Sequence, residues 1–186
     1  MVTKLRPGGV VTDTALELTC LIPTDRPKPV NDFFYEKLPH FRKLVSLRLG
    51  NGWLFNPPGE FWATKRNLRN LTLSSCTVPA DVLVNVVNSC TTLQHLKIYT
   101  SPIIWGSGAL PVQSRSLQEL TFDRVFTTDD ELLLTLFSGM SCKEATIIGA
   151  APPLLIQSVQ NSVTRLDLQF PTRMCHDRST ILSWEC

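Results

Sequence analysis

A pattern of leucines that repeats along the chain is the feature that most limits how this sequence can fold. The segment from Leu68 to Leu73 has the form L-x-x-L-x-L, and the same form returns 25 positions later, from Leu93 to Ile98. A cysteine, a proline-containing turn and a short apolar pattern of helical period fill the interval. Because one strand, one turn and one helix account for the interval, the sequence predicts a structural repeat.

Copies of this pattern extend over most of the chain. At intervals of 24, 25, 24, 25 and 21 residues, they start at Leu44, Leu68, Leu93, Leu117, Cys142 and Val163. One more unit is predicted before them, with a strand over residues 15–19, Leu16 and Leu18 turned towards the core, and Asp13 at the position that matches Leu44. A single unit leaves its apolar face in water, and only stacked neighbours bury it.

The predicted fold class is therefore α/β, a curved solenoid with parallel inner strands and outer helices or loops. Seven strands side by side make a sheet about 30 Å across. An ordinary doubly wound α/β sheet is the alternative, but the constant phase of the pattern favours the solenoid. The predicted organisation is a lead-in over residues 1–12, a repeat domain of about seven units over 13–170, and a tail without repeats over 171–186.

Helices are predicted between some of the strands. After Pro79, apolar residues recur on one helical face up to the segment Asn88–Cys90. Three other helices are predicted over residues 32–38, after the capping box that starts at Thr128, and from Pro152 onwards. An aromatic cluster of Trp53, Phe55, Phe61 and Trp62 is interpreted as core packing under a proline-rich loop, and the alternative is an exposed binding patch.

Composition excludes several classes of function. A formal net charge of +2 over 186 residues does not favour binding to nucleic acid or to a membrane surface. The sequence contains no apolar run of the roughly 18 residues that a membrane-spanning helix needs, and its N-terminus lacks the apolar core of a secretory signal. The expected location is therefore intracellular, in the cytoplasm or the nucleus.

The six cysteines are interpreted as reduced thiols, several of them buried as small apolar side chains. Cys76 in particular fits a small buried position in the turn after a strand. Val125 occupies the same position two units later. A zinc site at Cys175 and His176 is disfavoured because adjacent ligands suit one tetrahedral site poorly. No metal and no cofactor are predicted.

The repeat also resembles a known family. The form L-x-x-L-x-L-x-x-C from Leu68 to Cys76, and S-C-x-x-L from Ser89 to Leu93, resemble the cysteine-containing leucine-rich repeats of F-box proteins. The resemblance implies that the repeats present a substrate to a ubiquitin ligase, whose adaptor is bound by a separate N-terminal F-box. No F-box is seen here, since only about a dozen residues precede the first repeat, so adaptor binding is expected only if the chain is a fragment or a diverged copy.

The polar residues between the repeated leucines are predicted to lie on the inner, concave face of the sheet. They read as basic and aromatic in the centre and acidic further along, a distribution that can orient a partner by charge. The alternative is that polar residues must occupy any exposed strand face. The residues predicted to bind a protein partner are Arg48, Asn70, Thr72, His95, Lys97, Tyr99, Glu119, Asp123, Glu144 and Arg165.

The expected function is a non-catalytic protein–protein interaction module. An enzyme is disfavoured because no nucleophile is identifiable beside His95 and nothing orients a triad. The partner is expected to be a protein, and ubiquitin ligase components are included among the candidates. The alternative is a structural or diverged leucine-rich-repeat protein with no link to a ubiquitin ligase.

Overall fold

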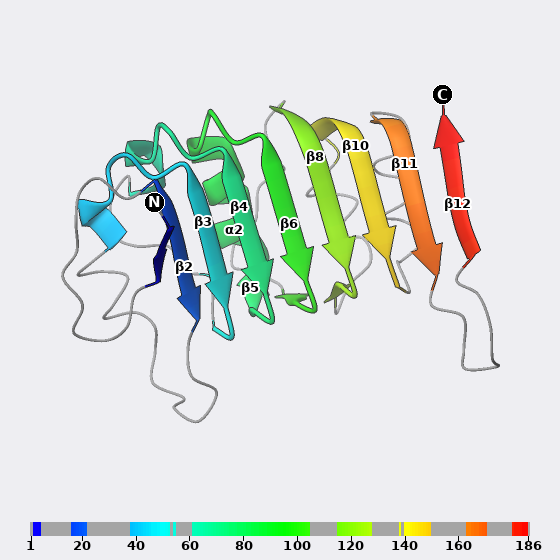
Figure 1. Cartoon of the computed structure of the whole chain (residues 1–186), viewed down its shortest axis with the longest axis horizontal. Coiled ribbons are helices and arrows are strands. Elements are labelled where there is room, and N and C mark those ends of the chain that lie inside the picture. Colours follow the sequence, from blue (N-terminus) through cyan, green and yellow to red (C-terminus); the bar gives the residue numbers. More distant parts are fainter. Residues whose placement is uncertain are drawn as a thin grey trace.

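A single row of strands dominates the computed structural model, in which the chain runs from one end of a long sheet to the other (Figure 1). The structure describes residues 2–4, 16–21, 38–52, 54, 61–104, 115–127, 138, 140–149, 163–170 and 180–185. In spatial order, the nine strands described in this sheet are β1 (Val2–Lys4), β2 (Glu17–Leu21), β3 (Ser46–Gly50), β4 (Asn70–Ser74), β6 (His95–Tyr99), β8 (Arg115–Asp123), β10 (Met140–Ile148), β11 (Val163–Phe170) and β12 (Thr180–Glu185).

The repeated leucines are aligned across this sheet. Strands β1 to β11 pair in parallel, and Leu71 of β4 stands in register with Leu47 on one side and Leu96 on the other. The same alignment continues to Leu120, Ala145 and Leu166, the last of which is partly buried. A shared apolar row of this kind buries surface that no single unit buries by itself, which confirms the predicted solenoid of repeats.

The described part of the sheet has nine strands instead of the predicted seven. Strand β1 pairs in parallel with β2, and β12 pairs antiparallel with β11. Neither segment contains the leucine pattern, so periodicity did not predict them. The open edge of a repeat strand offers unpaired backbone N–H and C=O groups, and any extended segment nearby satisfies them by pairing. The domain limits at residues 13 and 170 stay a prediction.

The predicted register of the first unit is wrong by two residues. Leu18 pairs with Leu47 and Cys20 with Leu49, so the buried pair in β2 is Leu18 and Cys20. Leu16, which was expected in the core, is 45% exposed. The sequence Leu16-Glu17-Leu18 alternates as well as Leu18-Thr19-Cys20 does, and the cysteine in the second apolar position concealed the true phase.

Helix α2 (Ala80–Ser89) is the helix predicted after Pro79, and it lies behind β4 in Figure 1. It buries Val82, Leu83, Val86 and Val87, as the sequence pattern predicts. The short 3-10 helices η1 (Leu38–His40) and η2 (Trp62–Thr64), together with a small parallel sheet of β5 (Val78–Pro79), β7 (Pro102–Ile104) and β9 (Phe126–Thr127), complete the described elements.

Other predictions on the returns between strands are tested in part. Phe61 and Trp62 are buried and their rings meet edge to face, with centroids 5.0 Å apart, which confirms core packing for these two aromatics. The described residues do not include Trp53 and Phe55, the helices expected after Thr128 and Pro152, or residues 32–37 of the helix expected before η1.

A backbone feature repeats directly after each inner strand. The residue that follows the strand has a positive φ in five successive units, and its N–H donates to a carbonyl of the next unit, as Thr100 N does to Asp123 O at 2.7 Å. Residues other than glycine disfavour this left-handed conformation, so the four turns without glycine store some strain. The five residues are Asn51, Ser75, Thr100, Arg124 and Gly149.

A second repeated position lies three residues before the first leucine of each unit. Cys90 holds it in one unit, and its thiol lies 3.5 Å from the carbonyl oxygen of Trp62, the first residue of η2. Lys65 holds it one unit earlier and donates to the carbonyl of Leu38, the first residue of η1, at 2.8 Å. Lys65 is 1% exposed. A buried ammonium in one unit therefore contacts the carbonyl at the start of a 3-10 helix, as a thiol does in the next unit.

The four described cysteines, Cys20, Cys76, Cys90 and Cys142, are free and buried. Burial raises the pKa of the Cys142 thiol to about 11. Burial, with a smaller effect of Cys76, also raises the pKa of Cys20 to about 11, so these thiols stay protonated and unreactive at neutral pH. Cys76 and Val125 are buried as predicted. Cys175 and His176 lie outside the described residues.

Among the helices that the structure describes, none has the length and apolarity needed to cross a membrane.

Candidate protein-binding face

The face of the sheet opposite α2 carries the polar residues that alternate with the buried rows, and we call it the open face. In register from β3 to β11 it has three rows. The first contains Ser46, Asn70, His95, Glu119, Glu144 and Arg165; the second Arg48, Thr72, Lys97, Thr121, Thr146 and Asp167; the third Gly50, Ser74, Tyr99, Asp123, Ile148 and Gln169.

All ten residues predicted to bind a partner stand in these rows. From β3 to β11 their relative positions agree with the predicted register, because the period of the leucines fixes the period of the residues between them. On β2 the two-residue shift leaves Glu17 and Thr19 in the first and second rows, and Ala15 outside the described part of the strand. Whether these residues bind a partner stays a prediction.

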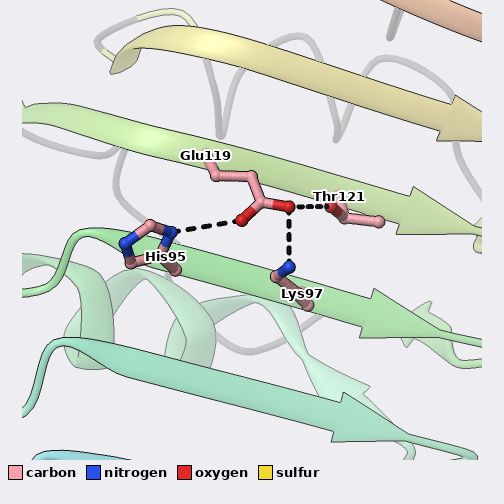
Figure 2. A network of polar contacts seen from close by, with 4 residues as sticks. All are labelled: His95, Lys97, Glu119 and Thr121. Carbon is pink, nitrogen blue, oxygen red and sulfur yellow. Dashed lines mark hydrogen bonds and ion pairs between the residues drawn. The ribbon is translucent and has the colours of Figure 1, made fainter.

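Figure 2 shows a polar network at the centre of the open face, where β6 meets β8. The carboxylate of Glu119 accepts from Lys97 Nζ at 2.7 Å through Oε1 and lies 3.1 Å from His95 Nδ1 through Oε2. The hydroxyl of Thr121 donates to Oε1 at 3.3 Å. His95 and Glu119 face each other across the two strands, while Lys97 and Thr121 face each other one row further on.

The network fixes the charge of Glu119. Partial burial raises the pKa of Glu119, but hydrogen bonds from Lys97 and His95, the positive charge of Lys97 and the Thr121 hydroxyl together lower this pKa below its usual value. The carboxylate is therefore ionised at neutral pH and compensates Lys97. Because the Glu119 side chain is 28% exposed and that of Lys97 is 33% exposed, water and salt weaken this pair.

Other predicted residues do not join this network. Asp123 binds Arg124, its own neighbour in the chain, with 3.0 Å between Arg124 Nε and Asp123 Oδ1. Arg48, Glu144 and Arg165 are exposed, and the structure gives none of them an ion pair within its described residues. The basic and acidic parts of the face expected from the sequence thus meet in the ion pair between Lys97 and Glu119. Arg48 and Glu144, on either side of this pair, have no ion pair within the described residues.

Sequence reasoning did not select Thr121 and Arg124 as site residues. Thr121 lies in the second row of the open face, but it is only 5% exposed and its hydroxyl donates to Glu119. Arg124 stands in the turn of positive φ, where it reaches Asp123. Its spacing, 24 residues after Thr100 and 25 before Gly149, follows the repeat and is the sequence signal that marks this turn.

Comparison with family models identifies the repeats. Residues 12–171 match the model described as "FBD-associated F-box protein At5g56370, LRR repeats". The chain belongs to this family. Leucine-rich repeats of this kind are in general protein-interaction modules and not enzymes, and the family match agrees with the resemblance seen in Leu68–Cys76 and Ser89–Leu93. Comparison with curated proteins gives no match.

One solved structure with a similar chain is the leucine-rich-repeat ectodomain of the plant membrane receptor kinase GASSHO1/SCHENGEN3 from Arabidopsis thaliana, crystallised in complex with CASPARIAN STRIP INTEGRITY FACTOR 2. The two chains share 20% identity, and their superposition has a TM-score of 0.33. The alignment covers 84% of this chain but only 17% of the ectodomain chain.

The described part of the F-box-associated repeats contains no group of three or more metal-ligating side chains. The open face presents hydroxyl, amide, guanidinium, ammonium and carboxylate groups along one surface. Hydrogen bonds and ion pairs from such groups determine orientation and specificity in protein interfaces.

Proposed function

We propose that the chain is a non-catalytic protein-binding module whose open face recognises the substrate of an F-box ubiquitin ligase. The observation that carries this proposal is the contrast between aligned apolar rows on one side of the sheet and rows without repeated chemistry on the other. A rigid sheet that presents a non-repeating polar surface is suited to bind one protein and reject others. Membership of the F-box-associated repeat family supports the link to a ligase.

The proposal includes an intracellular location, in the cytoplasm or the nucleus. The free, buried cysteines of the described chain support it, because structural thiols persist in reducing compartments. Ligase components are the expected assembly partners, through an F-box that belongs to the same assembly.

One observation favours the alternative, a structural leucine-rich-repeat protein without a ligase link. Glu119 already compensates Lys97 and contacts His95, so part of the predicted binding surface is satisfied within the chain. On this alternative the network stabilises the junction of β6 and β8 and no substrate binds there.

Quantitative capture of partners from cells tests the proposal. The wild-type protein is compared with the triple variant Arg48→Ala, Lys97→Ala and Tyr99→Ala, and with Asn85→Ala on the exposed side of α2 as a control. We expect a set of proteins that the wild type and the control capture and the triple variant loses. Removal of the protein should raise the cellular level of that set and reduce its ubiquitylation.

Two results would count against the proposal in different ways. An identical partner set for the wild type and the triple variant would overturn the open face as the binding site. A face-dependent partner set whose ubiquitylation does not change when the protein is removed would leave a binding module and overturn the ligase role.

A further inference from the structure

Most charges near the middle of the open face are compensated within the chain. Glu119 binds Lys97 at 2.7 Å and His95 at 3.1 Å, and Asp123 binds Arg124 at 3.0 Å. A cation that already has a carboxylate beside it attracts an incoming anion less strongly than an uncompensated cation does. The centre of the face is therefore a weaker anion site than its sequence suggests.

Arg48 on β3 differs from these cations. Its side chain is exposed, and within the described chain the structure gives its guanidinium neither an ion pair nor a hydrogen bond. The acidic residue on the neighbouring strand, Glu17, stands opposite Ser46 and not opposite Arg48. Arg48 is thus an available cation on the open face.

The surroundings of Arg48 suit an anionic group. Thr19 and Thr72 stand opposite it on β2 and β4, so a hydroxyl flanks it on each side. Ser46 and Gly50, its neighbours on the same face of β3, are small. A guanidinium with hydroxyls beside it and little bulk around it can bind a carboxylate or a phosphate with two parallel hydrogen bonds.

From this arrangement we infer that the open face binds an extended segment of its partner protein through an anionic side chain placed on Arg48. The inference rests on the proposed function and specifies the chemistry of the substrate. Glu119 acts as a positioning residue, because it neutralises Lys97 and so disfavours binding of the anion on β6. Arg48 and Lys97 lie two strands apart in register, about 10 Å at the usual strand spacing, so the two positions are distinguishable.

Selection of peptides tests the inference without knowledge of the natural partner. The protein selects from a phage-displayed library of random nine-residue peptides, which reach about 30 Å when extended and so cross about six strands. We expect Asp and Glu to be enriched. The best peptide is then synthesised with its acidic position as Glu, as phosphoserine or as Gln, and its binding is measured by fluorescence anisotropy at low and high salt.

Three variants locate the anion. Arg48→Glu should weaken binding of the Glu peptide about tenfold at low salt and less at high salt. Arg66→Glu, an equal charge change at an exposed turn residue before β4, should leave binding unchanged. Glu119→Gln should strengthen binding several-fold because it releases Lys97 as a further uncompensated cation. The order of the Glu and phosphoserine peptides shows whether the natural anion is a carboxylate or a phosphate.

Several outcomes would overturn the inference. These are equal binding of the Glu and Gln peptides, an equal effect of Arg48→Glu and Arg66→Glu, weaker binding to Glu119→Gln, or no selected peptide at all. None of these decides the proposed function, which the triple variant tests through captured cellular partners. Circular dichroism of each exposed variant verifies that the fold is intact.

Discussion

The two sides of strand β6 are built by different rules. On the buried side, Leu96 and Ile98 are fully buried and stand in register with leucine or phenylalanine on both neighbouring strands. On the open side, His95, Lys97 and Tyr99 stand beside residues of other chemistry on β4 and β8. The buried side must fit the same space in every unit, whereas the open side meets only solvent or a partner. Stability is therefore concentrated on the first side, and the proposed binding specificity on the second.

The largest predicted effect tests the buried side directly. Leu96→Ala should lower the free energy of unfolding by about 3–4 kcal/mol, because it leaves a cavity where the site cannot collapse. Leu166→Ala, at the same register position but partly buried on β11, should cost about half as much. Lys97→Ala on the open side should cost only about 0.5–1 kcal/mol, because it removes a partly exposed pair with Glu119. Urea unfolding followed by circular dichroism measures all three, and equal losses for Leu96 and Lys97 would contradict the comparison.

Among the residues that the structure describes, Lys65 is the charged exception on the buried side. Its ammonium donates to the carbonyls of Leu38 and Phe41 at 2.8 and 3.3 Å and lies 4.8 Å from the centre of the Phe61 ring. Lys65→Met should cost about 2–3 kcal/mol, because buried carbonyl groups lose their donor. Exposed Lys43→Met serves as the matched control in the same urea titration. A loss for Lys65→Met no larger than for Lys43→Met would show that the buried bonds contribute no net stability.

The turns after the strands lie between the two sides. Removing a side chain at one turn and adding one at another should change stability in opposite directions. Thr100→Gly should raise the free energy of unfolding by about 0.5–1 kcal/mol, since it relieves a β-branched residue at φ 47°. Gly149→Ala should lower it by about 1–2 kcal/mol, because φ is 102° and the added Cβ would lie 3.3 Å from Arg124 Cγ. Thermal unfolding midpoints give both signs. Two shifts in the same direction would contradict the stored strain.

The sequence predicted the inner sheet and the placement of the open-face residues because one period controls both. Leu71 and Leu96 are one full unit apart and stand in register. Thr72 and Lys97, the residues that directly follow these leucines, therefore had to fall in register too. The period could not predict β1 and β12, which pair with the open edges of the sheet and contain no repeat. It also failed at Cys20, where a cysteine in a leucine position shifted the apparent phase by two residues.

Contacts between units were harder to predict than positions. The sequence placed Lys97 and Glu119 on one face, but only the register shows that the carboxylate compensates the cation. Lys65 was overlooked because lysine is rarely buried. The segment Thr64-Lys65-Arg66-Asn67-Leu68 nevertheless aligns with Ser89-Cys90-Thr91-Thr92-Leu93, and this alignment is the signal that could have identified it.

The smallest predicted effect concerns the open side and depends on pH. The pKa of Glu119 is lowered in the folded chain, so its carboxylate adds stability above the ordinary carboxyl pKa and loses this contribution as the pH falls through the lowered value. At pH 7, Glu119→Gln should cost about 0.5–1 kcal/mol at low salt, because the pair is partly exposed. In urea titrations at decreasing pH, the difference between wild type and variant should shrink towards zero under acidic conditions. A difference that stays constant into the acidic range would show that the shape of the side chain, and not its charge, holds β6 and β8 together at this point.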